Sequence, residues 1–575
     1  MTEDLQNLED RRDRLYQKLH SFGDFRLGII SETYTRCGKK NCACAHKDHP
    51  GHGPRYLWNT TRQGKSLAQH LRLGPELDHV YKQIETGHRF QKWCQEAMEL
   101  NEGICRLRPV PQIEDEKELT ALKKKFAEEV LQETKEEIDR LIRRILQDKE
   151  KSGHLDLEAT ELSIRHCMHQ VGGVFLEKLL NADAGDHRGS RIPCGQGHQA
   201  ALVDYRIKQV TTVLSEIGIK RAYYHCQKCG NGLIPKDQDL DLENTSFSPG
   251  VRRMMARVGA KESFEDGRSD LKELADVVVT IKEVERTSEA IGGQIEVTAV
   301  REREQVMEGK VIPFLPALAK LYITIDGTGV PAVPSETEGR KGKDETGIAK
   351  TREAKLGALF TQTKVNEEGF AVRDEDSTTY VGAIETAEEF GPRIYTEAVR
   401  RGLNRAQKVI LLGDGAVWIR GIGEDHFPEA VQIVDLYHAL EHLSGLGKMF
   451  YGPTGSIVSR WIETQSVELK EGDIEKVIAS MRRLRPQKKS IQEEIEKTLG
   501  YFETNKERMR YAEFRKQGLF VGSGVIEAGC KMIVGQRLKQ SGMRWTVRGA
   551  NAIIALRCCQ ISGRWEEFWE NRAAE

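Results

Sequence analysis

The spacing of apolar positions changes along the chain, and each spacing predicts a different kind of structure. Between residues 77 and 150, apolar side chains recur at three- and four-residue steps among Lys and Glu, which predicts long helix. Residues 210–224 alternate between apolar and polar side chains, which predicts strand. From Leu321 onward, apolar runs such as LYITID and VILLGDG are separated by helical or polar stretches, so a sheet-centred α/β region is expected there.

Shorter segments complete the pattern. Helical stretches within residues 248–295, separated by short breaks, loosely resemble a helix-turn-helix. Residues 335–353 are polar and lysine-rich and predict a mobile loop, whereas residues 440–520 return to helix. We therefore expect segments at residues 1–75 (a small Cys/His module), 76–185 (helical), 186–240 (β-rich, with flanking cysteines), 241–315 (helix-turn-helix-like, for DNA binding), 316–440 with 521–575 (α/β core) and 441–520 (helical).

Composition adds limits rather than a function. At 575 residues the chain is too long for one hydrophobic core, so a multidomain protein is expected. Lys and Arg total 87 against 88 Asp and Glu, so any DNA binding must come from local patches. No apolar run approaches the roughly 18 to 20 residues of a membrane span, and the start MTEDLQNLEDRRD lacks the core of a signal peptide. We expect a cytoplasmic protein without a membrane partner.

Four residues around the β-rich segment have the spacing of a zinc ribbon. Cys194 and His198 precede the alternating stretch, and Cys226 and Cys229 follow it as a Cys-x-x-Cys pair. Four protein ligands leave no open coordination position, so this zinc is expected to be structural. A redox Cys-x-x-Cys is the competing interpretation, and the second pair upstream favours zinc over it.

A second cluster lies nearer the N-terminus. Cys37, Cys42 and Cys44 stand close together and are followed by three histidines, at positions 46, 49 and 52. We choose His52 as the fourth zinc ligand, because its flanking glycines let the backbone bring the ring back to the cysteines. The spacing is not that of a standard finger. The other six cysteines, Cys530 among them, have no such context and are expected to be small buried residues.

Two aspartates end apolar runs in the α/β region. Asp326 ends LYITID, Asp414 ends VILLGD, and each is followed by glycine. Ligand sites in α/β sheets collect at strand ends, and glycine lets a phosphate approach closely. An Asp-Gly pair taken alone is more often a simple turn, so these two positions indicate a site only because they occur together.

Glu527 adds a third acidic side chain. It lies in GSGVIEAGCK, where Ser523 is a candidate N-cap and Glu527 is expected in the first turns of the helix. Two Asp and one Glu are oxygen donors that suit Mg²⁺ or Mn²⁺ rather than zinc. Two such ions would activate a water or a 3′ hydroxyl and stabilise the leaving oxygen of a phosphodiester. By itself, Glu527 is more simply explained as a solvated helix residue.

Four phrases carry a resemblance to a known family. ITIDGTGVP, LLGDGAVWI, IVDLYHALEHL and GSGVIEAGCK, with RLKQSGMRW after the last, resemble bacterial insertion-sequence transposases of the Kra group, in the RNase H-like DDE superfamily. The resemblance covers most of the chain. It implies a multidomain α/β fold with an RNase H-like catalytic core, an all-α insertion at residues 441–520, and Asp326, Asp414 and Glu527 as the catalytic triad.

The same resemblance draws attention to Asp435 and His438. They look like the Asp-x-x-His element of the wider Mutator-like transposases, which would place them beside the active site as support. The alternative is a strand-end Asp that caps a helix, with a structural His nearby. The sequence does not decide between these two interpretations.

A basic stretch follows Glu527 and is a candidate DNA-binding surface. Cations there would lie along a phosphate backbone while the tryptophan stacks on a base. The alternative is a solvated cationic helix face with the tryptophan in the core. The residues are Lys531, Arg537, Lys539, Arg544, Trp545 and Arg548.

These observations predict a DDE transposase that uses Mg²⁺ or Mn²⁺ for chemistry and Zn²⁺ for structure. Its partners would be transposon-end DNA and target DNA, in a bacterial cytoplasm at the nucleoid. We expect a homodimer or higher homo-oligomer, because two ends must be joined. The alternatives are an RNase H-like nuclease or resolvase that cuts without joining, and an inactive zinc-containing DNA-binding regulator.

Overall fold

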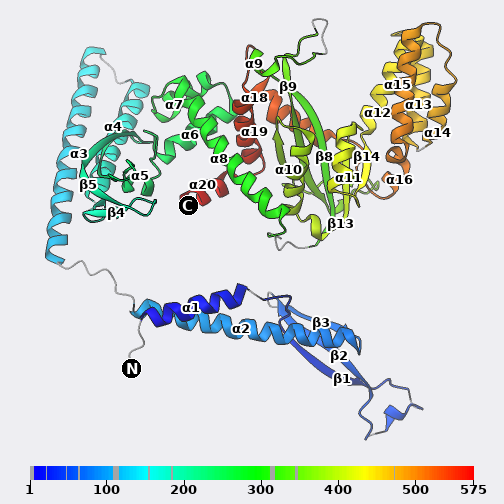
Figure 1. Ribbon diagram of the computed structural model, residues 1–575, viewed down its shortest axis with the longest axis horizontal. Helices are drawn as coiled ribbons and strands as arrows, with labels where there is room; N and C mark the ends of the chain where they lie inside the picture. The colour runs from blue at the N-terminus through cyan, green and yellow to red at the C-terminus, as the bar shows by residue number, and fades with distance from the viewer. Residues whose placement is uncertain are drawn as a thin grey trace. The chain divides into compact units, whose positions relative to one another are not determined.

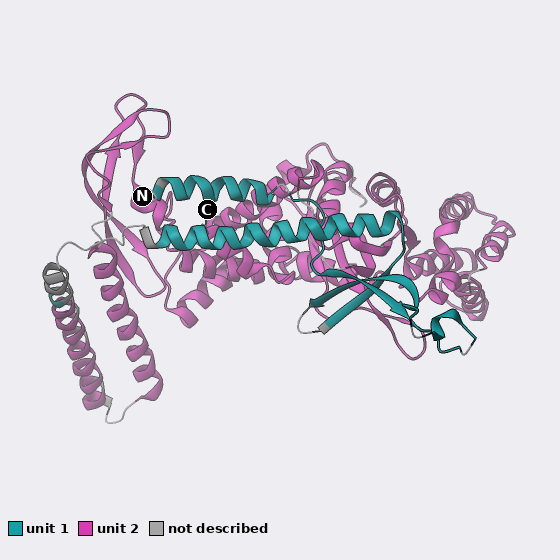
Figure 2. Ribbon diagram, turned by 90° about the horizontal axis from the view of Figure 1, so that it is seen from below, with its two compact units in different colours: residues 1–125 teal, residues 126–575 magenta. Residues whose placement is uncertain are grey.

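The computed structural model describes residues 5–20, 22–39, 41–46, 48–62, 65–107, 116–152, 156–182, 186–310, 317–342, 347–471 and 473–574. It divides into two compact units, unit 1 (Met1–Lys125) and unit 2 (Phe126–Glu575), coloured separately in Figure 2. The predicted segment boundaries at 185 and at 315–316, and part of the predicted loop 335–353, lie outside the described residues.

Unit 1 combines two helices with a small sheet. Helix α1 (Leu5–His20) packs against α2 (Pro75–Leu107) through buried side chains that include Leu8, Leu15 and Ile104. The antiparallel sheet has the order β1 (Ile29–Thr35), β2 (His52–Arg62) and β3 (Lys65–Leu71), and a short 3₁₀ turn η1 (Ala43–Ala45) lies between β1 and β2. The sheet packs on α2 through a buried apolar cluster that includes Leu71, Leu77 and Val80.

The next part contains long helices and a cysteine-flanked sheet. Helix α3 (Glu116–Ser152) spans the unit boundary, and α4 (Leu157–Ala182) packs against the sheet that follows it. That sheet is antiparallel, in the order β4 (Arg191–Pro193), β5 (Gln199–Thr211), β6 (Glu216–His225) and β7 (Gly232–Leu233), with α5 (Pro235–Asp239) after it. The alternating stretch predicted as strand lies within the β5–β6 hairpin.

Three helices then form the region expected to resemble a helix-turn-helix. They are α6 (Pro249–Lys261), α7 (Phe264–Ala275) and α8 (Ile281–Met307), and side chains of Ser248, Ser263 and Thr280 cap their N-termini. Helix α8 is longer than expected. Ala256, Ala260 and Ile291 pack into the same core as the C-terminal helix α19 (Val547–Ile561). This region is therefore joined to the α/β core by packing.

The centre of unit 2 is a five-stranded mixed sheet in the order β12-β9-β8-β13-β14 (Figure 1). Strand β8 pairs antiparallel with β9 and parallel with β13, so one half of the sheet is antiparallel and the other parallel. The strands are β8 (Leu318–Pro331), β9 (Thr351–Gln362), β12 (Thr379–Ala383), β13 (Ala406–Gly413) and β14 (Val431–Val434). A small hairpin, β10 (Lys364–Val365) with β11 (Ala371–Val372), follows β9.

Helices cover both faces of this sheet. Leu321, Ile323 and Ile325 of β8 pack on α10 (Ala387–Arg400) and α11 (Val417–His426). Tyr322 points the other way, toward α12 (Leu436–Tyr451), because successive strand residues face opposite sides. Asp326 therefore shares the face of Tyr322, and the helix α17 (Gly524–Gly529) lies on this face too.

The remaining helices belong mainly to the stretch predicted as helical insertion and to the C-terminal part. The insertion holds α13 (Ser456–Lys470), α14 (Ile474–Arg482), α15 (Lys489–Asn505), a 3₁₀ turn η4 (Lys506–Met509) and α16 (Tyr511–Lys516). The C-terminal part adds the π-helical turn η5 (Cys530–Gly535), α18 (Gln536–Leu538) and α20 (Trp565–Ala574). Short elements α9 (Pro334–Thr337) and η3 (Leu403–Arg405) complete the chain. No helix in the described part of the chain is long and apolar enough to cross a membrane.

Candidate functional site

The four residues predicted as a zinc ribbon come together in the sheet of β4–β7. Ligand atoms of Cys194, His198, Cys226 and Cys229 all lie within 4.8 Å of one another. Each pair sits in a tight turn: the N–H of Cys194 donates to the His198 carbonyl, and the N–H of Cys226 to that of Asn231. The backbone N–H of Cys229 lowers the pKa of Cys226 to about 6, which favours the thiolate that binds metal.

The donor set of this cluster fits Zn²⁺. Three sulfurs and one imidazole match the tetrahedral sites that zinc occupies in proteins. His198 Nδ1 is buried and has no hydrogen-bond partner among the described residues, and a bound ion would satisfy this nitrogen. Cys194 and Cys226 are buried, and His198 and Cys229 are half-buried. Four protein ligands around one zinc ion would leave no open position for substrate.

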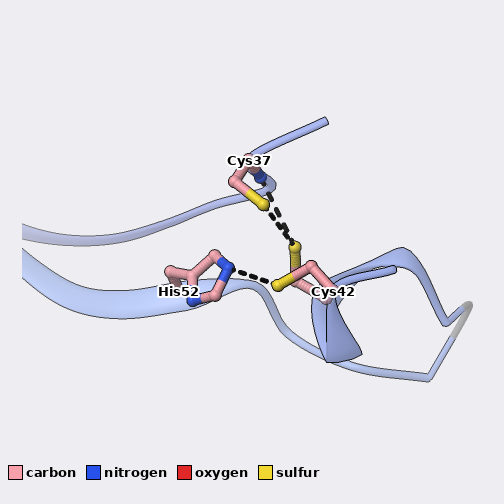
Figure 3. Close-up of side chains that lie close together, drawn as sticks. Cys37, Cys42 and His52 are labelled. Carbon is pink, nitrogen blue, oxygen red and sulfur yellow. Dashed lines mark hydrogen bonds between the residues drawn. The ribbon is translucent and has the colours of Figure 1, made fainter. Parts of the chain in front are cut away.

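The N-terminal cluster also converges, with His52 as its histidine. Cys42 Sγ lies 2.9 Å from His52 Nε2 (Figure 3), and Cys37 Sγ lies 3.5 Å from Cys44 Sγ. Thr35 of β1 pairs with His52 of β2, and this register carries the histidine to the cysteines. The backbone N–H of Lys39 lowers the pKa of Cys37 to about 6. These four ligand atoms too lie within 4.8 Å of one another and fit Zn²⁺.

Asp326 lies on β8, and Asp414 directly follows the neighbouring strand β13. Only one of the two predicted strand ends is present. Strand β8 does not end at Asp326; it continues to Pro331 because β9 pairs with it throughout. Its parallel partner β13 does end at Gly413, with Leu412 opposite Thr324. Asp326 and Asp414 therefore lie side by side where β13 leaves the sheet.

Burial and charge act together on Asp326. Burial raises the pKa of Asp326, and the nearby Asp414 carboxylate raises this pKa too. The N–H of Gly327 and the Cys530 thiol donate to the Asp326 carboxylate at 2.7 and 3.5 Å and oppose that shift. The Asp414 charge and the partial burial of Asp326 therefore both disfavour the ionised form of Asp326 in the absence of a cation.

Glu527 approaches from the helix on the same face of the sheet. It lies in α17 and is exposed, and Ser523 Oγ is 3.4 Å from its Oε1. The sequence predicted that Ser523 caps this helix, but the Ser523 hydroxyl makes no capping hydrogen bond. One turn after Glu527, Cys530 touches Asp326, so this helix faces the first aspartate. Among the described residues, the three acidic side chains are not within 4.8 Å of one another as a group.

Asp435 caps the N-terminus of α12, as one of the two interpretations of the sequence predicted. Its Oδ1 accepts the backbone N–H of His438 at 2.7 Å, and its Oδ2 accepts the N–H of Ser523. Asp435 is 2% exposed, and its own N–H donates to the Gly413 carbonyl. It therefore ties β13, α12 and the start of α17 together. His438 lies near enough for its charge to lower the pKa of Asp326.

The basic stretch separates into exposed and buried residues. The side chains of Lys531, Lys539, Arg544 and Arg548 are exposed. Lys539 Nζ donates to Thr328 Oγ1 at 2.6 Å, two residues beyond Asp326 on β8.

Arg537 and Trp545 are core residues. Arg537 has no exposed surface and donates to the Gly259 carbonyl, while Trp545 is 7% exposed and donates to that of Leu538. Neither side chain is available to DNA. Trp545 lies in the core, as the alternative interpretation of the basic stretch predicted. Arg252, in the helical region expected to bind DNA, is likewise buried against Asp241.

The fold and the site thus define a multidomain α/β protein with two Cys/His clusters and a group of acidic side chains at its central sheet. Residues 196–572 match the family described as "Uncharacterised protein family (UPF0236)", and the chain belongs to this family. Residues 5–81 match "Domain of unknown function (DUF6788)".

Two further proteins are similar to this chain, both at low sequence identity. One is the "UPF0236 protein in vanSb 3'region" of Streptococcus gallolyticus, 22% identical over 388 residues that cover 65% of this chain and 77% of that protein. The other is a solved structure, "Drosophila P element transposase strand transfer complex", at 7% identity and a TM-score of 0.19, covering 59% of this chain and 84% of that one. A TM-score this low does not define a shared fold.

Three residues of the site were not found from the sequence. Cys530 was expected to be a buried thiol without a role, yet it touches Asp326. Tyr501 and His442 stack on one another beside Asp414. The position of Cys530 one turn after Glu527 was a usable signal, whereas nothing in the local pattern links Tyr501 to a strand 87 residues away.

Proposed function

We propose that this protein is a DDE transposase that cuts DNA at transposon ends and joins those ends to target DNA. The observation that carries the proposal is the placement of Asp326 on β8 and Asp414 at the end of the parallel strand β13, with the helix of Glu527 on the same face. The mixed five-stranded sheet with helices on both faces supports an RNase H-like core, and the helices between α12 and α17 support an insertion within it.

The three carboxylates would hold Mg²⁺ or Mn²⁺, since oxygen donors suit these ions. Bound there, such ions would supply activation of the attacking oxygen and stabilisation of the leaving one. Asp326 lies beside Asp414 and faces the helix of Glu527, so these three side chains would hold the ions.

The chain's other residues would bind and orient the DNA. Lys539 donates to Thr328, two residues after Asp326 on β8, and its ammonium group would contact a phosphate at the site. Lys531, Arg544 and Arg548 would extend this contact along the backbone. The two zinc clusters would be structural. We further propose a homodimer or higher homo-oligomer acting at the bacterial nucleoid, because two ends must be joined.

The test is a cleavage and strand-transfer assay with labelled transposon-end DNA and supercoiled target in Mg²⁺. Wild type is compared with Asp326→Asn, Asp414→Asn and Glu527→Gln, each of which keeps the side-chain shape and removes a charged ligand. Asp425→Asn, an exposed carboxylate of α11, is the matched control. We expect wild type and the control to join DNA, and each of the three site variants to lose at least about a thousandfold in rate while still binding DNA.

Other outcomes would replace this proposal with a different function. Cleavage without joined products would indicate a nuclease or resolvase that uses the same carboxylates. Binding without cleavage under Mg²⁺ and Mn²⁺ would indicate a regulator. Full activity of Asp326→Asn would show that these carboxylates do not hold the metal.

A further inference from the structure

Tyr501 of α15, in the helical insertion, contacts the Asp414 turn. Tyr501 Oη donates a hydrogen bond to the backbone carbonyl oxygen of Asp414 at 2.7 Å, across 87 residues of sequence. Burial raises the pKa of the Tyr501 phenol, so this hydroxyl keeps its proton at neutral pH and remains a donor. The contact therefore joins a helix outside the sheet to the residue that follows β13.

The turn has little room beside this contact. Gly415 has a φ of +86°, and a Cβ at this position would lie 3.0 Å from both Cε2 and Oη of Tyr501. On its other side, Asp414 Oδ1 accepts the N–H of Ala416 at 2.8 Å. The peptide of Asp414 is thus held by Tyr501, and its carboxylate by the backbone that begins α11. Small shifts of the tyrosine would be transmitted to the aspartate.

Tyr501 is itself held by aromatic contacts with α12. Its ring stacks on His442 with centroids 4.3 Å apart and an angle of 30°. The His442 ring stands edge-on to His438, 4.9 Å away at 85°. Burial lowers the pKa of His442, which favours the neutral form of the ring that stacks on Tyr501. Asn505 also donates to the Tyr501 carbonyl at 2.8 Å, which fixes the end of α15.

We propose that Tyr501 is a positioning residue through which the helical insertion sets the geometry of Asp414 for divalent metal binding. The proposal rests on the proposed function, in which Asp414 is a metal ligand. Tyr501 does not contact metal or DNA and acts only through the Asp414 turn. Metal affinity at the site then depends on where α15 stands, so DNA that shifts the insertion would change the occupancy of the metal site.

The experiment measures Mn²⁺ binding to the full-length protein by calorimetric titration and by the electron paramagnetic resonance of free Mn²⁺. Tyr501→Phe removes only the hydroxyl and keeps the stack. Tyr451→Phe is the matched control, because Tyr451 lies in α12, packs on Phe450 and Trp461, and is 38% exposed. Asp414→Asn identifies which binding belongs to the site. The thermal unfolding midpoint and the metal-free affinity for DNA are recorded for each variant.

We expect Tyr501→Phe to bind Mn²⁺ about fivefold more weakly than wild type, the equivalent of one lost hydrogen bond. Its unfolding midpoint should fall slightly below that of Tyr451→Phe, because the Asp414 carbonyl loses its donor. Its metal-free DNA affinity should match that of Tyr451→Phe, which a general loss of structure would not predict. Unchanged Mn²⁺ affinity in Tyr501→Phe, or an equal loss in Tyr451→Phe, overturns the inference. Wild type without Asp414-dependent Mn²⁺ binding overturns it as well.

The two proposals can fail separately in this experiment. Wild-type protein that binds Mn²⁺ through Asp414 but neither cuts nor joins DNA would refute the transposase proposal. The Tyr501→Phe result would keep its meaning in that case, because it is read from metal binding alone.

Discussion

Arg537 shows that a basic residue in a stretch proposed to bind DNA can belong wholly to the core. Its guanidinium lies 4.6 Å from the ring centroid of Phe264 and 5.0 Å from that of Trp545. Burial lowers its pKa to about 10, which still leaves it charged at neutral pH. Ring faces and the Gly259 carbonyl take the place of a carboxylate partner.

We predict opposite effects for two neighbouring arginines. Arg537→Ala should lower the free energy of unfolding by about 3 kcal/mol, because it leaves a cavity and an unpaired carbonyl. Arg544→Ala, at an exposed position, should change it by less than about 0.5 kcal/mol and reduce the salt dependence of DNA binding by about one phosphate contact. Urea unfolding and binding titrations at several salt concentrations measure both. A stable Arg537→Ala protein with weaker DNA binding would return Arg537 to the proposed DNA-binding surface.

At the scale of elements, the contact between α8 and α19 depends on one glycine. A Cβ at Gly292 would lie 2.2 Å from the carbonyl oxygen of Ala552, so the two helix backbones approach closely there. A Cβ at the next residue, Gly293, would have no neighbouring atom within 4 Å. Two adjacent glycines of one helix therefore differ in whether the packing requires glycine.

The adjacent pair makes a controlled experiment. Gly292→Ala should destabilise the protein by at least about 2 kcal/mol, because overpacking forces α8 away from α19. Gly293→Ala should stabilise it by up to about 1 kcal/mol, because alanine favours helix and meets no neighbour. Chemical denaturation of the two variants beside wild type tests this. The close approach is refuted if both substitutions have the same sign.

The elements also show what could and could not be predicted from the sequence. Alternation over residues 210–224 predicted β6 but missed most of β5, which begins at Gln199. The apolar runs predicted β8, β13 and β14, because these patterns record which face is buried. The continuation of β8 past Asp326 was missed, since the residues DGTGVP lack an apolar run and extend only because β9 pairs with them. Arg537 was misjudged because its partner, Gly259, is 278 residues away.

At the scale of the whole molecule, each compact unit carries one Cys/His cluster in the part of the chain that is described. No residue is shared between the clusters. Zinc at one site should therefore stabilise its own unit without requiring the other site.

Metal analysis should find two Zn²⁺ per chain in wild type and one in either Cys42→Ser or Cys226→Ser. Cys105→Ser, an exposed cysteine outside both clusters, should retain two. Thermal unfolding of each single-site variant should lower the transition of one unit alone. Loss of both ions from one substitution would contradict independent sites.

Acid should release this zinc in a defined range. Cys37 and Cys226 have pKa values lowered to about 6, so their thiolates stabilise the folded form above the pKa of an unfolded thiol. That stabilisation is lost as the pH falls through about 6, where protons compete with the metal. A zinc-sensitive dye should report release between about pH 7 and 5. Retention of both ions well below about pH 5 would show that these thiolates do not control binding.

The hydrogen bonds that Asp435 accepts bear on how the sequence of such a protein can change in evolution. The Ser523 N–H donates to Asp435, and the Leu436 N–H donates to the Val521 carbonyl at 2.9 Å, so the chain leaves the sheet and returns to it at one place. Related chains can therefore lengthen, shorten or exchange the intervening helices while Asp326, Asp414 and Glu527 keep their places. Only a replacement that supplies its own contact to the Asp414 turn would preserve what Tyr501 does there.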